Sequence, residues 1–242
     1  MTQRPTRTGK FRGAPKQAQI RLKDFANSFN CASDPKLVSA MDSAMEACMA
    51  EAYARQYREG YTELWTDGSY DDKDHRAGIG IMIRQMPAPG SGRAGQEPDI
   101  KAIFGKAVKA SDSQEAELYA MAVGLSYLLD ACPDVKSVRL RYDCVGASVT
   151  AANIDAYASR GAPYTNFRSA LKRARKAGVV ILFQHVKSHA GNDGNEICDL
   201  LAKHYANIPL LPAQHDKIAK YTKRGTSRAI PKKGGAAHGG TR

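Results

Sequence analysis

The sequence predicts an α/β fold in which a five-stranded mixed sheet carries helices on both faces. Three segments with strand-like composition follow one another without a helix between them, which predicts an antiparallel meander. Two further strand segments alternate with helices, and the last of them is almost continuously apolar. Such strands are typical of a parallel arrangement that is covered on both faces. We therefore expect the first, fourth and fifth strands to be parallel.

The individual elements follow from hydrophobic period and from turn residues. We predict strands at 61–69, 77–85, 101–108, 137–143 and 179–186. A loop rich in proline and glycine, at 86–99, joins the second and third strands. Helices are predicted at 115–131, 164–177 and 195–206, and the second of these is strongly basic.

Both ends of the chain differ from this middle region in composition. Residues 1–30 are basic and have no hydrophobic period, which predicts a disordered arm. Asp34-Pro35 resembles the start of a helix, so 31–60 are predicted to form an amphipathic helical extension whose apolar side is a packing face. Residues 208–242 are predicted to be a basic, glycine-rich tail.

The net charge of +12 is concentrated in these ends. Residues 1–23 contain seven basic residues and 217–242 contain eight, with no acid in either segment. The remaining 21 basic residues face all 24 acids, so the middle region is slightly acidic. Basic tails of this kind favour binding to nucleic acid through its phosphates.

Other features limit the class of protein. The five cysteines include no C-x-x-C pair, so we expect neither a disulfide framework nor a zinc site, and a cytoplasmic location fits best. The N-terminus has no apolar core typical of a signal peptide, and no apolar stretch is long enough to span a bilayer. We therefore expect no membrane association, and we expect a monomer.

Four acids occupy positions that suit a catalytic metal site. Asp67 and Asp143 end two predicted parallel strands, which places both carboxylates in the crevice beyond the strand ends. Glu117 lies near the start of the following helix, and Asp199 lies in the first turns of the last helix. Acids gathered in this way repel one another unless cations lie between them. Oxygen ligands without cysteine or histidine select Mg²⁺ or Mn²⁺, and a pair of such ions can catalyse phosphodiester hydrolysis.

The chain resembles the type 1 ribonuclease H family in four segments that occur in the family's order. These are TDGSY at 66–70, AELYA at 116–120, RYD at 141–143 and VKSHAGNDGNEICDLLAK at 186–203. The resemblance implies a ribonuclease H-like fold with strand order 3-2-1-4-5 and a catalytic domain at 61–207. It also implies an endonuclease that cuts the RNA strand of RNA:DNA hybrids and leaves 5′-phosphate and 3′-hydroxyl ends.

The resemblance further assigns roles to individual residues. Asp67, Glu117, Asp143 and Asp199 would hold two Mg²⁺ ions, for which Mn²⁺ could substitute, and His189 would assist proton transfer or product release. Substrate contacts would come from four residues that are mostly small or amide-bearing: Gly68, Ser69, Gln114 and Asn195. Where the family often has glutamine two residues after the third acid, this chain has Val145, which implies a weaker grip on the hybrid.

Two other functions remain open at this point. Integrases, transposases and junction resolvases share the predicted sheet, but they generally use three acids. They also lack the motif of His-Ala-Gly, Asn-Glu and Asp that this chain has at 189–199. A hybrid-binding scaffold that does not cleave would keep the fold, and it would bind the hybrid without Mg²⁺.

Overall fold

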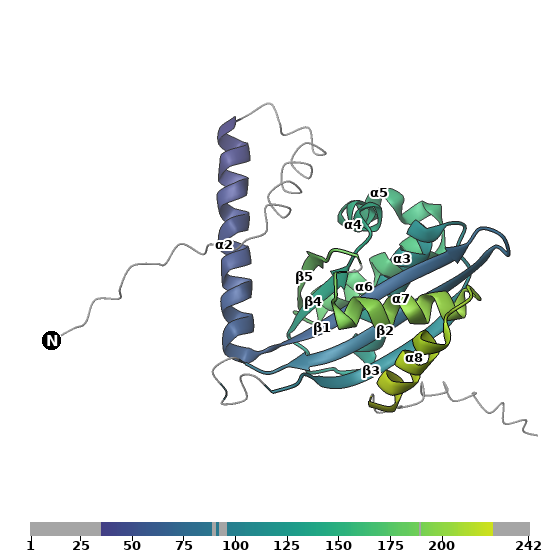
Figure 1. The fold of residues 1–242 in the computed structure, drawn as a ribbon. Coiled ribbons are helices and arrows are strands. Elements are labelled where there is room, and N and C mark those ends of the chain that lie inside the picture. Colours follow the sequence, from purple (N-terminus) through teal and green to yellow (C-terminus); the bar gives the residue numbers. More distant parts are fainter. Residues whose placement is uncertain (1–34, 89–90, 92–95, 189, 225–242) are drawn as a thin grey trace, which may run out of the picture. The chain divides into compact units, whose positions relative to one another are not determined.

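The computed structural model describes residues 35–88, 91, 96–188 and 190–224. The chain divides into two compact units, Met1–Glu51 and Ala52–Arg242. The described part of the first unit belongs to helix α2, whose full extent is Pro35–Glu59. The sheet and the remaining helices belong to the second unit (Figure 1). The predicted arm at 1–30 lies outside the described residues.

All five predicted strands and the three predicted helices of the middle region are present, with ends that differ by a few residues. The strands are β1 (Tyr61–Asp71), β2 (Arg76–Met86), β3 (Asp99–Val108), β4 (Ser137–Tyr142) and β5 (Val180–His185). The helices are α3 (Ser113–Ala131), α6 (Ala162–Lys176) and α7 (Asp193–Tyr205). Short helices that the sequence did not predict connect β4 to α6: α4 (Val145–Ala152), α5 (Ile154–Tyr157) and the 3₁₀ helix η2 (Ala158–Arg160).

The sheet has the order β3-β2-β1-β4-β5, which confirms the predicted topology. The first three strands pair as an antiparallel meander, whereas β1 pairs with β4 and β4 with β5 in parallel. The pairing therefore changes from antiparallel to parallel at β1, which has β2 on one side and β4 on the other. Because β1 is longer than β4, the carboxyl end of β4 lies beside the middle of β1.

Helices cover both faces of the sheet, as predicted (Figure 1). Helix α3 packs on β1 and β2, and α6 packs on α3, around a core that includes Leu64, Ile81, Leu125, Leu140 and Phe167. On the other face, α7 packs across β2, β1 and β3. Its contacts form a smaller core of Trp65, Met82, Val186, Ile197, Cys198 and Leu201.

Two glycines of the central strands allow α7 to approach β2 closely. A Cβ atom added to Gly80 would lie 2.0 Å from the carbonyl oxygen of Cys198, and one added to Gly78 would lie 2.2 Å from that of Ala202. Both distances are far below van der Waals contact, so only glycine is compatible with this spacing. The helix thus rests on the backbone of β2.

A further helix, α8 (Pro212–Arg224), lies within the segment that the sequence predicted to be a tail. Helix α8 contacts α7 and β3, and Ile218 and Tyr221 pack against the core beneath α7. Ile218 and Tyr221 are three residues apart, as on one face of a helix, but they lie in a run that is otherwise mostly basic and polar. This composition made the helical pattern too weak to predict. The segment from 225 onward lies outside the described residues.

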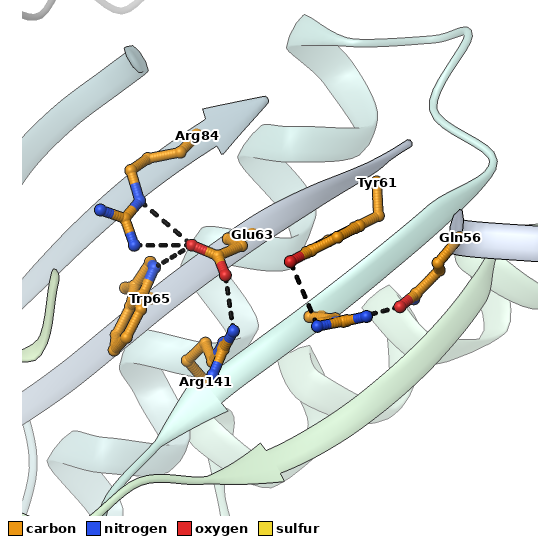
Figure 2. A network of polar contacts seen from close by, with 7 residues as sticks. Gln56, Tyr61, Glu63, Trp65, Arg84 and Arg141 are labelled. Atoms are coloured by element: carbon orange, nitrogen blue, oxygen red, sulfur yellow. Dashed lines mark hydrogen bonds and ion pairs between the residues drawn. The ribbon is translucent and has the colours of Figure 1, made fainter. Parts of the chain in front are cut away.

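A buried polar network joins β1, β2 and β4 around Glu63 (Figure 2). Glu63 is only 2% exposed and accepts hydrogen bonds from Arg84 and Arg141, each at 2.6 Å, and from the indole of Trp65 at 3.0 Å. Burial opposes ionisation of Glu63, but the charges of Arg141 and Arg84 outweigh it and lower the pKa of the carboxyl. Glu63 therefore stays ionised and fixes the position of Trp65.

The end of α2 that belongs to the second unit is tied to the same region. The side chain of Gln56 donates to the hydroxyl of Ser137 at 2.8 Å and accepts from Arg139. The guanidinium of Arg139 lies 3.9 Å from the ring centroid of Tyr61 and 5.4 Å from that of Tyr53. The last turns of α2 thus pack on the edge of the sheet where β1 and β4 begin. No helix among the described residues combines the length and apolar character needed to cross a membrane.

Replacing Gly80 by alanine is expected to destabilise the chain by about 1 to 3 kcal/mol, because the new methyl group pushes α7 off β2. Unfolding in urea can be followed by the fluorescence of Trp65, the single tryptophan of the chain. Gly146→Ala is the control, since the atoms nearest to its added Cβ belong to the far end of the Gln114 side chain and not to backbone, and alanine favours the helix. Equal stability of the Gly80 variant and the parent would contradict a tight contact.

Candidate active site

The pairing of β1 and β4 brings Asp67 and Asp143 together, although Asp67 lies within β1, which continues to Asp71, and not at its end as predicted. Trp65 of β1 lies opposite Arg141 of β4 in the parallel register. Continuing this register by two residues places Asp67 beside Asp143, which directly follows the last residue of β4. Asp67 points to the same face of the sheet as Trp65, because successive side chains of a strand alternate between the faces.

Glu117 reaches Asp67 because α3 packs against the backbone of β1. A Cβ atom on Gly68 would lie 2.2 Å from the amide nitrogen of Glu117, so glycine permits the close approach. The start of α3 is fixed by Asp112, whose carboxylate accepts a hydrogen bond from the amide of Glu115 at 2.7 Å. The sequence predicted that Gly68 lets the substrate backbone approach closely. The side of Gly68 on which a Cβ atom would lie is filled by the backbone of α3.

The carboxylates of Asp67, Glu117 and Asp143 form one group, in which a ligand atom from each lies within 4.8 Å of the others. Asp67 and Glu117 are each 5% exposed. Burial, assisted by the charges of Asp143 and Asp199, raises the pKa of Asp67 to about 8. Burial and the adjacent Asp67 raise the pKa of Glu117 well above its usual value.

Asp199 lies near this group but is not a member of it. Helix α7 places Cys198 against Gly80, which is the register partner of Asp67, and Asp199 is the next residue. Its charge contributes to the raised pKa of Asp67, so the two acids are within electrostatic reach. The side chain of Asp199, however, accepts a hydrogen bond from Lys203 at 2.8 Å. The spacing of four residues on a helix could have predicted this ion pair.

Asn195, which the sequence predicted to contact the substrate, contacts Asp143 in the structure. Its side-chain nitrogen donates to Asp143 Oδ2 at 2.9 Å, and the residue is only 3% exposed. The preceding residue, Gly194, lies so close to Trp65 that an added Cβ would be 2.4 Å from the ring. Asn195 is therefore a group that orients Asp143, and the amino-terminal end of α7 is held by Trp65.

His185, to which sequence reasoning gave no role, also contacts this part of the site. Its ring nitrogen Nε2 lies 2.9 Å from the backbone carbonyl oxygen of Asp143. The parallel register of β4 and β5 brings this about, because Tyr142 is the partner of His185. No local sequence signal marks such a contact, which depends on strand pairing.

The other predicted site residues lie around the acids or outside the described part of the chain. Ser69 follows Gly68 in β1 and is half-buried. Gln114 lies on the exposed first turn of α3, where its side chain donates to Thr150 of α4 at 2.9 Å. His189 lies outside the described residues.

The three grouped acids fit a divalent metal ion. All their donor atoms are hard oxygens, and Glu117 Oε2 is buried without a hydrogen-bond partner among the described residues. Within the described ranges, none of the three acids forms an ion pair with lysine or arginine. A cation would relieve the repulsion that raises these pKa values.

Several solved structures are similar to the chain. The chain is similar in structure to RNase H1 from the halophilic archaeon Halobacterium salinarum, with 18% identity over 62% of this chain and 100% of that one, at a TM-score of 0.42. The N-terminal RNase H domain of a Mycobacterium tuberculosis protein is 15% identical over 64% and 96% of the two chains, at a TM-score of 0.44. LC11-RNase H1, solved in complex with an RNA/DNA hybrid, is 15% identical over 60% and 96%, also at 0.44.

None of the curated protein sequences matches the chain. The model of the family described as RNase H matches residues 59–207, which include all four predicted acids and every strand of the sheet. This match covers more than half of the sequence and confirms the resemblance seen in the four signature segments. The chain belongs to the RNase H family.

Proposed function

We propose that the chain is an endoribonuclease that hydrolyses the RNA strand of RNA:DNA hybrids with two Mg²⁺ ions, leaving 5′-phosphate and 3′-hydroxyl ends. The observation that carries the proposal is the buried group of Asp67, Glu117 and Asp143, with Asp199 beside it. Burial of Asp67 and Glu117 beside Asp143, without a lysine or arginine partner among the described residues, is costly in a protein that binds no cation. Membership of the RNase H family supports the choice of substrate.

The residues of the chain would have distinct tasks in this reaction. Asp67, Glu117, Asp143 and Asp199 would hold the two ions. Bound ions of this kind supply a water of lowered pKa and neutralise charge on the leaving oxygen. Asn195 holds Asp143 in a fixed orientation, as its hydrogen bond of 2.9 Å supports. His189, which follows the strand carrying His185, would move protons or assist product release.

Recognition of the hybrid would use the exposed groups near the acids. Gln114 and Ser69 could contact the minor groove, where the 2′-hydroxyl groups distinguish RNA from DNA. The exposed lysines of α6 and α8 and the basic segments at 1–23 and 225–242 would bind phosphates without sequence preference. Exposed Val145, where many relatives have an amide, supports the expectation of a weak grip at the site itself.

A non-cleaving scaffold and an integrase-like nuclease are the alternative functions. A scaffold has no need of a costly buried acid group, which favours an enzyme. An integrase-like enzyme would cut duplex DNA, and the same assay that tests the proposed activity distinguishes it.

Asp67→Asn is expected to reduce cleavage of a labelled RNA:DNA hybrid by at least about 100-fold, because it removes the central metal ligand. The parent should cleave the hybrid with Mg²⁺ and not with EDTA, and it should leave double-stranded DNA intact. Asp134→Asn, at an exposed loop position, is the matched control and should retain activity. Full activity of the Asp67 variant, or cutting of the DNA duplex by the parent, is incompatible with the proposal.

In the absence of metal ions, the stability of the chain is expected to fall as the pH rises. The folded chain keeps a proton on Asp67 up to about pH 8, whereas the unfolded chain releases it near its ordinary value of 3.8. The stabilisation is therefore complete below about pH 4 and is lost as the pH rises through 8. A difference of one pKa unit corresponds to about 1.4 kcal/mol, so the trend is measurable.

Urea unfolding in EDTA between about pH 5 and 8 measures this trend through Trp65 fluorescence. Asp67→Asn should flatten the decline, because asparagine does not titrate, while Asp134→Asn should follow the parent. Added Mg²⁺ should stabilise the parent most at the upper end of the range. A parent curve without a decline would show that the acids are not buried together.

Removal of residues 225–242 is expected to weaken binding of the hybrid and to make its salt dependence shallower, with cleavage chemistry retained. The segment contains four basic residues, so the slope of log affinity against log salt should change by at most about 4. The truncation keeps α8, whose contacts with α7 would otherwise be lost. Binding titrations at several salt concentrations measure the slope, and an unchanged slope would limit the segment to a role in solubility.

A further inference from the structure

We propose that Lys203 competes with a metal ion for Asp199. The ammonium group of Lys203 pairs with this fourth carboxylate until a divalent ion displaces it. The proposal rests on the proposed function, because it takes Asp199 to be a metal ligand. Its consequence is that one of the two ions binds more weakly than the carboxylates alone would allow.

The geometry separates Asp199 from the other acids. A ligand atom from each of Asp67, Glu117 and Asp143 lies within 4.8 Å of the others, and Asp199 is not in this group. The oxygen Oδ2 of Asp199 instead lies 2.8 Å from Lys203 Nζ, one helical turn further along α7. The three grouped acids are thus free to receive an ion, whereas Asp199 already has a cationic partner.

Partial burial makes this ion pair stronger than an ordinary surface pair. The side chain of Asp199 is 18% exposed and that of Lys203 is 31% exposed. Attraction between unlike charges grows as water is excluded, so a partly buried pair is harder to break than the median exposed pair. A metal ion that binds Asp199 must supply this free energy, and its observed affinity is lowered by the same amount.

A neighbouring pair provides the internal comparison. Lys217 of α8 forms an ion pair with Glu196 of α7, and both pairs line an open pocket of about 300 Å³ between the two helices. Lys217 therefore carries the same charge as Lys203 and lies in the same pocket, but it is paired to an acid outside the proposed metal set. Helix α8 lies beyond residues 59–207, the part that matches the family. If positive charge alone weakened metal binding, removal of either lysine would tighten it. Direct competition predicts tighter binding only when Lys203 is removed.

The test is calorimetric titration of the full chain with Mn²⁺ and with Mg²⁺, without nucleic acid. The parent should bind two ions of unequal affinity. Lys203→Met should tighten the weaker ion by about 3- to 10-fold, the equivalent of one partly buried ion pair. Lys203→Arg, which keeps the charge, should bind as weakly as the parent, and Lys217→Met should remain within about twofold of it.

Thermal unfolding gives a second readout that does not depend on activity. In EDTA, Lys203→Met leaves Asp199 without its partner and should unfold at a lower temperature than the parent. The rise in unfolding temperature on addition of Mn²⁺ should then be larger than for the parent. Lys203→Gln serves the same purpose if the methionine variant does not fold, as judged by Trp65 fluorescence.

The outcomes distinguish this inference from the proposed function. Parent-like affinity in Lys203→Met, or equal tightening in Lys217→Met, overturns the competition while leaving the nuclease proposal intact. A parent chain that binds no divalent ion, or an Asp67→Asn variant that binds ions as the parent does, overturns the metal site itself and both proposals with it.

Discussion

The arrangement of the site depends on the contact of two helices with the bare backbone of the central strands. Gly68 lets the start of α3 lie against β1, and Gly80 lets α7 lie against β2. Asp67 is adjacent to one of these glycines in sequence and opposite the other in register, so both contacts converge on it. Any larger side chain would move a helix by more than the tolerance of a metal site, which is about half an ångström.

These contacts stabilise an arrangement that electrostatics opposes. Two of the grouped acids, Asp67 and Glu117, are buried, and burial raises their pKa values. The fold compensates through the apolar cores on both faces of the sheet and through the Glu63 network, in which two arginines neutralise one buried carboxylate. Glu63 and Asp67 of β1 thus have opposite surroundings: Glu63 is neutralised by two arginines, whereas Asp67 has no lysine or arginine partner among the described residues.

The sequence was sufficient to predict the fold because hydrophobic period and residue order determine strand pairing. The parallel pairing of β1 with β4 places Asp67 beside Asp143, as the sequence predicted, although β1 continues past Asp67 to Asp71. The sequence was insufficient where the outcome depends on side-chain packing: it did not predict that Asn195 donates to Asp143, nor that α3 lies against Gly68. Helix α8 was missed because its basic composition resembles a tail and its two apolar anchors are inconspicuous.

The difference between Asp199 and the other three acids has a simple origin in the elements that carry them. Asp67 and Asp143 lie on paired strands, and Glu117 lies on a helix pressed against one of those strands, so their separation is fixed by backbone contacts. Asp199 lies on α7, where a lysine one turn away is always within reach. Three rigidly placed acids beside one that is paired with a lysine would suit the proposed binding of two ions of unequal affinity. The lysine would then keep the fourth acid neutralised and in place whenever the second ion is absent.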